Sequence, residues 1–149
     1  MRIISTLLLV LLLSVSCHKS KNCEEPNLDC STVRCFAFWY YFDFRVVDKN
    51  TGTDLVFGTN PRYTINDIKL FSDAALSVPI SLTVDNTKQI FQTDVAASEM
   101  WLQINGTDVY KLNANFMTVT CCSQRVKILM SDDRVVCSCC SEAIAVPVR

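Results

Sequence analysis

Nine cysteines and their distribution constrain this chain more than any other feature. They fall into two groups, with 85 cysteine-free residues between Cys35 and Cys121. A disulfide between the groups would place the start and the end of the folded part side by side. Such a bond closes a loop of roughly 100 residues, which the chain-entropy treatment values at ~4 to 5 kcal/mol. We therefore expect at least one such bond.

The N-terminus has the pattern of an export signal. Met1-Arg2 is followed by the apolar run IISTLLLVLLLSV and then by Ser16-Cys17. These correspond to a basic segment, an apolar segment of signal length and a small residue at a cleavage site. The run is shorter than the ~20 apolar residues of a membrane-spanning helix. We predict that residues 1–16 are a signal peptide, removed after export through the Sec pathway.

The residues around this cleavage site resemble a bacterial lipobox. In that motif a small residue precedes a cysteine that receives a diacylglycerol and an N-acyl chain such as palmitate. Ser14 stands where the motif usually has leucine, so an ordinary signal peptide cleaved nearby is the alternative. The polar stretch HKSKN after Cys17 is typical of a tether. We expect Cys17 to be lipidated, residues 17–34 to form the anchor and tether, and the protein to sit in the cell envelope, at the outer membrane.

If Cys17 carries lipid, eight cysteines remain, and a set of disulfides requires an even number. Disulfides persist outside the cytoplasm, where an exported chain folds. Eight cysteines allow many connectivities, so no pairing is predicted. Zinc and reactive thiols are alternatives, although neighbouring residues on a strand point to opposite faces and do not converge easily on one ion. The candidates for disulfide bonds are Cys23, Cys30, Cys35, Cys121, Cys122, Cys137, Cys139 and Cys140.

The run FAFWYYFDFRVVD after Cys35 alternates strictly between two faces. Period two predicts a long strand, and a second strand from Asp54 to Phe57 would complete a hairpin across the turn DKNTG. Trp39 and Tyr41 could form a ligand platform, but we favour a core position for them and for Trp101. The face predicted to be buried carries Phe36, Phe38, Tyr40, Phe42, Phe44 and Val46.

Short apolar runs separated by turn residues continue to residue 138, with almost no helical periodicity. This pattern is typical of a β-sandwich. We predict an all-β fold, a single antiparallel β-sandwich over residues 35–149, whose last hairpin turns at SDD. The runs are IKLF from Ile68, ISLTV from Ile80, QIFQT from Gln89, WLQI from Trp101, VYKL from Val109, FMTVT from Phe116, VKILM from Val126 and RVVCS from Arg134.

The predicted domain lacks the side chains that most catalytic sites use. The one histidine, His18, belongs to the tether, so no Ser-His-Asp or Cys-His dyad can form in the domain. Asp132 and Asp133 lie at a predicted turn, where acids are usually only solvated. The segment DKNTGTD departs from a calcium loop because Gly52 stands at position five. We predict that the protein is not an enzyme and has no catalytic residue, metal site or cofactor.

Charge argues against a nucleic-acid partner. Without Arg2, the 14 basic residues become 13 against 15 acidic ones, and they are scattered singly along the chain. We expect the membrane to be the partner through the lipid anchor, with an envelope protein or glycan that the sequence does not identify. The alternative function is a thiol-redox or metal-binding protein that uses the C-terminal cysteines.

The chain resembles the small Bacteroidota-type lipoproteins in FRVVDKNTGTDLVF, in NDIKLFSD from Asn66, and in TVTCC ahead of the last hairpin. Strand, DxxTG turn and strand also resemble the opening of transthyretin-like and carboxypeptidase-regulatory-like sandwiches. This resemblance implies an Ig-like Greek-key topology, and it carries over no functional residues. From the strand pattern and the absence of histidine in the domain we predict a non-catalytic binding or structural module. His18, Lys19 and Lys21 are basic where surface-exported members have acids, so the resemblance does not imply surface exposure.

Overall fold

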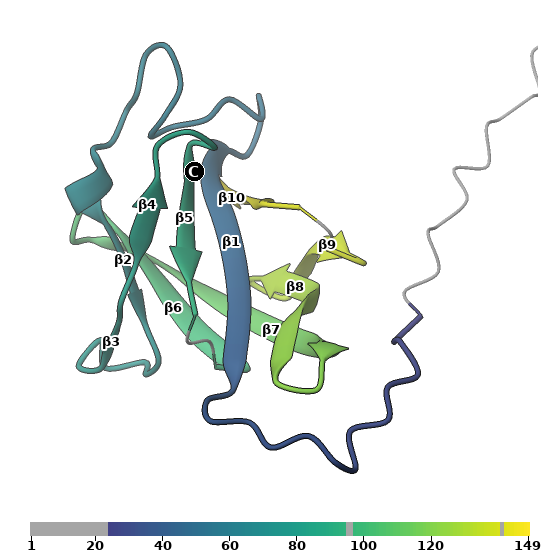
Figure 1. Cartoon of the computed structure of the whole chain (residues 1–149). Coiled ribbons are helices and arrows are strands. Elements are labelled where there is room, and N and C mark those ends of the chain that lie inside the picture. Colours follow the sequence, from purple (N-terminus) through teal and green to yellow (C-terminus); the bar gives the residue numbers. More distant parts are fainter. Residues whose placement is uncertain (1–23, 95–96, 141) are drawn as a thin grey trace, which may run out of the picture.

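The computed structural model describes residues 24–94, 97–140 and 142–149. Within these residues the chain forms ten strands and one 3-10 helix, η2, at Ile65–Asp67 (Figure 1). The prediction of an all-β fold is confirmed. The strands are β1 Trp39–Asp48, β2 Ile68–Phe71, β3 Pro79–Ile80, β4 Thr83–Asp85, β5 Ile90–Thr93, β6 Glu99–Ile104, β7 Asp108–Thr120, β8 Ser123–Ser131, β9 Arg134–Ser138 and β10 Ile144–Val148.

The strands form one curled sheet in the order β3-β2-β6-β7-β8-β1-β5-β4, with β9 added beside β8 and β10 beside β1. Most neighbours are antiparallel, but β1 pairs in parallel with both β8 and β10. The sheet is therefore mixed, which differs from the expected antiparallel arrangement throughout. Parallel neighbours need long connections, and residues 49–122 separate β1 from β8 while residues 49–143 separate it from β10.

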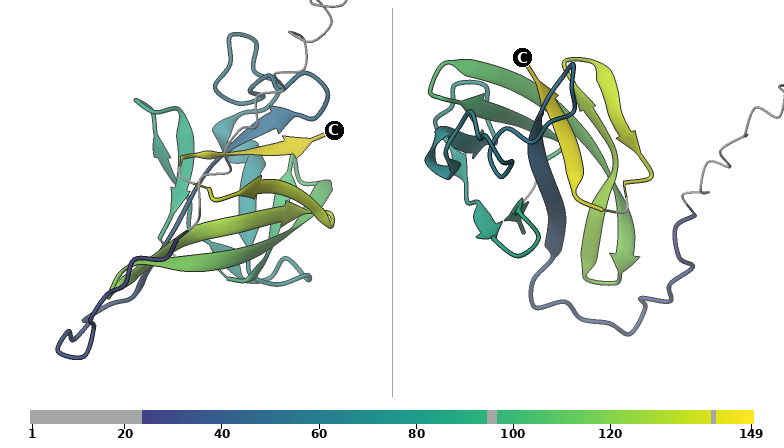
Figure 2. Two further views of the ribbon diagram at one scale, coloured as in Figure 1. Left: turned by 90° about the vertical axis from the view of Figure 1, so that its right-hand side faces the viewer. Right: turned by 90° about the horizontal axis from the view of Figure 1, so that it is seen from above.

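Strand β1 joins the two halves of the curl. Its first residues pair with β8, from Trp39 opposite Ser123 to Tyr41 opposite Arg125. Farther along β1 the neighbours are β5 and β10. Figure 2 shows that the half containing β7 and β8 faces the half containing β1 and β10. The sheet therefore folds over its own apolar side.

The core fills the space inside this curl. Phe42, Phe44 and Val46 are completely buried, as the alternation predicts. The rings of Phe42 and Phe44 stack with centroids 4.8 Å apart, and Phe44 stacks on Phe91 of β5 at 5.3 Å. The opposite half contributes the fully buried side chains of Met100, Leu102, Ile104, Leu112 and Leu129.

The predicted burial fails at the start of the run. Phe36 and Phe38 precede β1 and are exposed, because the strand begins only at Trp39. Tyr40 is half-buried, and complete burial begins at Phe42. The alternation therefore continues beyond the point where the opposite half of the curl ends.

The predicted strand from Asp54 to Phe57 is also wrong. Asp54 makes one isolated bridge to Val47, and its carboxylate then accepts hydrogen bonds from the N–H groups of Val56 and Phe57, at 2.9 and 2.8 Å. These bonds turn the chain away from β1. Leu55 and Val56 are nevertheless buried, so their side chains pack in the core although this loop forms no strand.

Strand β10 was not predicted, although Ile144, Val146 and Val148 alternate and are buried. Pro147 argues against a strand in the sequence, because proline has no N–H to donate to a neighbouring strand. Its position at the edge of the sheet, paired only with β1 among the described strands, removes that requirement. Two other predicted runs, at Val109 and Phe116, merge into the single strand β7, with an irregularity between Asn115 and Phe116.

Candidate functional site

Two disulfides hold the segment before β1 against the turn between β7 and β8. Cys30 is bonded to Cys121 and Cys35 to Cys122, with Cα atoms 5.5 and 5.4 Å apart. These bonds span 91 and 87 residues of sequence. The prediction of at least one disulfide between the two cysteine groups is confirmed, and the structure has two such bonds.

The remaining described cysteines are bonded as well. Cys137 pairs with Cys140, three residues later, and Cys139 also takes part in a disulfide. Cys17 and Cys23 lie outside the described residues. In this state none of the seven described cysteines offers a free thiolate, which is the form that binds metals and attacks disulfides.

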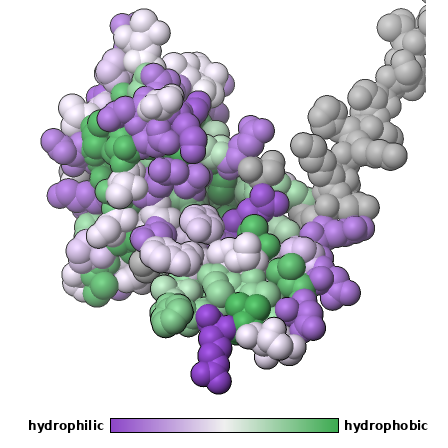
Figure 3. Space-filling view, in the orientation of Figure 1, coloured by the Kyte–Doolittle hydropathy of each residue, from purple (hydrophilic) through white to green (hydrophobic). Residues whose placement is uncertain are grey.

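Exposed aromatic side chains gather beside the two long-range disulfides. Phe36 is fully exposed, and Phe38, Trp39 and Tyr41 are 44–48% exposed. We call these four residues the aromatic tip. In Figure 2 (left) the segment before β1 and the β7–β8 hairpin extend together beyond the rest of the sheet. Figure 3 shows apolar surface gathered at this lower end. In the two segments that the disulfides join, Val33 and Val119 are exposed as well.

Backbone and ring contacts fix the position of the aromatic tip. The Trp39 N–H donates to the Cys122 carbonyl at 3.0 Å. The Tyr40 ring lies 5.3 Å from both the Phe38 and the Phe116 rings. Because side chains alternate along a strand, Trp39 and Tyr41 project from the face of β1 opposite Tyr40. The tip therefore presents aromatic rings on both faces of the strand end.

The interpretation of Trp39 and Tyr41 as core residues is wrong. Their side chains are about half exposed because no described element covers that face at the start of β1. Trp101 is half-buried, with the Lys111 ammonium 5.8 Å from its ring centroid. Alternation indicates the face on which a residue lies, but the extent of the opposite layer decides whether that face is covered.

Charged residues of both signs lie around the tip, since Asp43 and Asp94 line a pocket together with Tyr41. Residues 30–42 and 109–131 include no Asp or Glu. Their charged residues are Arg34, Lys111, Arg125 and Lys127. The Glu25 carboxylate lies 3.6 Å from the Lys127 ammonium, and the Glu99 carboxylate lies 2.7 Å from the Lys111 ammonium. The tip is thus apolar, and its surroundings are of mixed charge.

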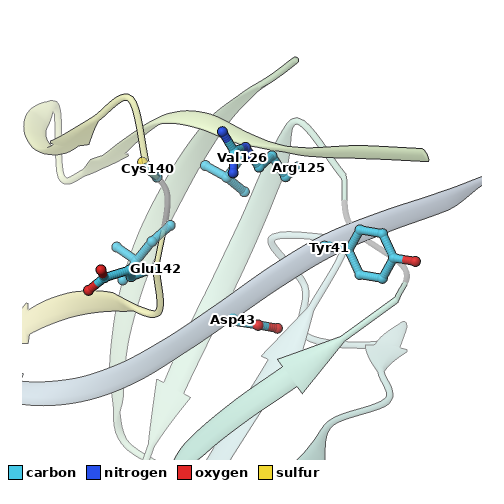
Figure 4. A pocket seen from close by; sticks show the side chains of 7 residues that line it. Tyr41, Asp43, Arg125, Val126, Cys140 and Glu142 are labelled. Atoms are coloured by element: carbon cyan, nitrogen blue, oxygen red, sulfur yellow. The ribbon is translucent and has the colours of Figure 1, made fainter. Parts of the chain in front are cut away.

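A small pocket lies at the fork where β8 and then β10 follow each other along one edge of β1 (Figure 4). Its volume is about 100 Å³. The Arg125 Nε is buried in the fold and has no hydrogen-bond partner among the described residues. The lining residues are Tyr41, Asp43, Arg125, Val126, Cys140, Glu142 and Ile144.

A wider, open hollow of about 620 Å³ continues from this pocket and shares Asp43 and Glu142 with it. Arg45 lines the hollow and donates from Nη2 to the Lys88 carbonyl at 2.6 Å. Within the described part of the chain, Asp43 and Glu142 form no ion pair. The two hollows therefore offer mixed charges that can hydrogen-bond a polar group, without a nucleophile paired to a base.

The predicted turn residues occupy turns. Asp132 and Asp133 are exposed between β8 and β9. The Asp48 carboxylate accepts hydrogen bonds from the N–H groups of Asn50 and Thr51, at 2.9 and 2.8 Å, which closes the DKNTG turn. These bonds hold the pKa of Asp48 below its usual range.

No protein-family model, curated protein or solved structure matches the chain. In the part of the chain that the structure describes, no helix is long and apolar enough to cross a membrane.

Proposed function

We propose that the chain is an exported lipoprotein whose lipid, at Cys17, holds the disulfide-bonded β domain at the outer membrane. There it acts as a non-catalytic binding or structural module of the cell envelope. One observation carries the proposal: all seven described cysteines are in disulfides. Such bonds persist in oxidising compartments and are rare in the cytoplasm.

The cysteine count supports the lipid assignment. Six of the described cysteines pair with one another, so the bonded Cys139 requires a partner elsewhere. If Cys17 carries the lipid, Cys23 is the cysteine that remains. The proposal therefore predicts a Cys23–Cys139 bond and no free thiol.

Mass spectrometry of the protein purified from membranes tests this. We expect a mature N-terminus at Cys17 carrying three acyl chains, and a non-reduced digest that contains the peptide pair with Cys23 and Cys139. The variant Cys17→Ser should leave the membrane fraction, whereas the neighbouring Ser20→Ala should remain there. An unmodified Cys17, or Cys17 in a disulfide, would contradict the proposal.

A binding role fits the aromatic tip. Its rings are exposed although two disulfides and a backbone hydrogen bond hold the segment in place. A rigid, exposed aromatic surface loses little conformational entropy when it is covered, which favours recognition. The domain would then serve as a scaffold that presents this surface at a set distance from the anchor.

A second candidate function is thiol–disulfide exchange. Cys137 and Cys140 are bonded across two intervening residues, the C-x-x-C spacing of many redox-active pairs. Cys140 is only 8% exposed, which restricts access to its sulfur. Titration with glutathione buffers separates the two functions. A redox role requires that this bond be reduced at potentials well above about −300 mV, whereas a structural bond stays intact there.

A further inference from the structure

We propose that the aromatic tip lies in the headgroup region of the membrane that holds the anchor, so that the domain keeps one orientation instead of swinging on its tether. The inference rests on the proposed lipid anchor at Cys17. It adds a second contact with the same bilayer, made by Phe36, Phe38, Trp39 and Tyr41.

The side chains of the tip suit a membrane–water interface. Tryptophan and tyrosine are enriched there because their rings are apolar while the indole N–H and phenol O–H reach water. Phe36 and Phe38 add rings without polar atoms, and Phe36 is fully exposed. In water this surface is unfavourable, whereas in the headgroup region its apolar area is buried.

The tether places the tip within reach of the bilayer. Glu25 contacts Lys127 of β8, and the proposed Cys23–Cys139 bond would fix the chain nearby, so the free tether is the six-residue step from Cys17 to Cys23. At ~3.6 Å per residue this tether spans at most roughly 22 Å, and β8 begins beside the tip, where Ser123 pairs with Trp39. This link makes contact between the tip and the bilayer an intramolecular event with a high effective concentration.

One basic residue lies where it can meet lipid headgroups. The four residues of the tip are uncharged, and Arg34 lies between the two disulfide-bonded cysteines Cys30 and Cys35. Basic residues near a membrane surface are attracted to anionic lipid headgroups. Asp43 and Asp94 line a pocket with Tyr41, so we expect the aromatic rings, and not the net charge, to provide most of the membrane affinity.

Tryptophan fluorescence tests the inference, because the chain has two tryptophans and one of them is in the tip. The full-length lipidated variant Trp101→Phe leaves Trp39 as the sole emitter. It is reconstituted into vesicles of phosphatidylethanolamine and phosphatidylglycerol, with and without brominated acyl chains. We expect a blue shift of Trp39 emission relative to detergent-free protein lacking the anchor, and a loss of emission with brominated lipid. The variant Trp39→Phe gives the background from Trp101 if the first variant folds poorly.

Matched variants identify the surface. Phe36→Ser with Phe38→Ser should reduce the loss of Trp39 emission, whereas Val78→Ser with Val135→Ser, two exposed positions elsewhere, should leave it unchanged.

If the protein floats with the vesicles but brominated lipid does not quench Trp39 emission, the inference about the tip is wrong, while the proposed lipid anchor is retained. If the blue shift of Trp39 emission instead grows with the amount of protein per vesicle, a second copy covers the tip. If the shift occurs only when an envelope protein is added, that protein covers the tip. Either result overturns the inference. If the wild-type protein does not float, the lipid anchor itself is refuted.

Discussion

Aspartate carboxylates end several strands and loops of this domain by accepting hydrogen bonds from the backbone. Asp48 accepts from Asn50 and Thr51, while Asp85 accepts from Lys88 at 2.9 Å. In each case the bond from a backbone N–H is the main reason why the pKa of the carboxyl lies below its ordinary value. Asp73 has the same arrangement, with the Val78 N–H at 2.7 Å as its main donor.

These lowered pKa values predict acid sensitivity. A proton binds the unfolded carboxyl more tightly than the folded one, so the stabilisation is present above the unfolded pKa of about 4 and is lost as pH falls through the folded pKa. Urea unfolding between pH 7 and pH 2 should show a free energy of unfolding that declines below about pH 4. Asp48→Asn should weaken this decline, and a free energy that stays constant to pH 2 would refute the argument.

Phe42 and Phe36 test how far the alternation of β1 determines burial. Both belong to the even-numbered face, but Phe42 is completely buried and Phe36 fully exposed. Phe42→Ala should lower the free energy of unfolding by about 3–5 kcal/mol because it leaves a cavity. Phe36→Ala should change it by less than about 0.5 kcal/mol. Denaturant unfolding at neutral pH measures both, and equal losses would show that Phe36 packs in the fold.

The residue types of the tip are visible in the sequence, whereas their exposure is not. A run of aromatic residues at period two is equally consistent with a core strand and with a strand end that extends past its covering layer. Nothing local distinguishes Phe38 from Phe42. The difference arises because the disulfides at Cys30 and Cys35 hold the strand start beside a turn, beyond the opposite half of the curl.

Two hairpins at the scale of elements use the same turn geometry. Asn105, Gly106 and Thr107 connect β6 to β7, and Asp132 and Asp133 connect β8 to β9. The turn itself is at Asn105 and Gly106 in the first hairpin, where the Thr107 N–H donates to the Ile104 carbonyl at 3.2 Å. The four turn residues, Asn105, Gly106, Asp132 and Asp133, have positive φ, at 51°, 74°, 47° and 63°. Two consecutive positive φ values match the type I′ turn, for which Asn-Gly is the favoured sequence. The second hairpin keeps this geometry with two aspartates, which tolerate it less well than glycine.

Asp133→Gly should therefore stabilise the protein. The substitution makes the second turn resemble the first and relieves the cost of a left-handed residue, so we expect a gain of about 0.5–1 kcal/mol, reduced by the added freedom of the unfolded chain. The reverse change, Gly106→Ala, should destabilise by a similar amount, since a Cβ there meets no atom within 4 Å and only backbone strain acts. Thermal unfolding of the two variants measures these effects, and a loss of stability in Asp133→Gly would contradict them.

Local sequence patterns predicted most strands but not their partners. The runs at Ile68, Trp101, Val126 and Arg134 lie in strands, and the run at Gln89 does so from Ile90 onward. Alternation within a segment reports one buried face and says nothing about which strand forms the ladder. The parallel pairing of β1 with β8 and β10 therefore could not be read from β1 itself. It depends on chain segments more than 70 residues away.

The two long-range disulfides act on the whole molecule as a crossed pair, because the earlier of Cys30 and Cys35 is bonded to the earlier of Cys121 and Cys122, and the later to the later. With Cys35–Cys122 in place, Cys30–Cys121 closes a ring of only a few residues, since the paired positions are five and one residues apart. The chain-entropy relation assigns about 2 kcal/mol to such a short ring and about 4.6 kcal/mol to the first bond across the chain. When one bond is removed, the other therefore keeps most of the stabilisation that comes from closing the long loop.

Removal of these bonds should be strongly non-additive. Cys30→Ala with Cys121→Ala, or Cys35→Ala with Cys122→Ala, should each cost about 2 kcal/mol, whereas removal of all four cysteines should cost about 7 kcal/mol. Guanidinium unfolding of the three variants provides the comparison. A fourfold variant that loses only the sum of the two pairs would show that the bonds act through local packing.

At this scale the sequence indicated that the chain ends meet but did not indicate the pairing. Cys121 and Cys122 are adjacent, and Cys30 and Cys35 are both near the start. Either assignment would close almost the same loop, so loop entropy does not distinguish them. In the fold, the cysteine nearer to β1, Cys35, is bonded to the cysteine nearer to β8, Cys122.

The order of these bonds along the chain has a consequence for biogenesis. Cys30 and Cys35 emerge from the ribosome or the translocon about 90 residues before their partners, and for that interval each is the other's nearest described thiol. An oxidase that joins cysteines in order of appearance would link them to each other and trap the chain. If the chain is exported as proposed, a disulfide isomerase must reopen this early link, and cells without one should accumulate a misoxidised form that migrates differently on non-reducing gels.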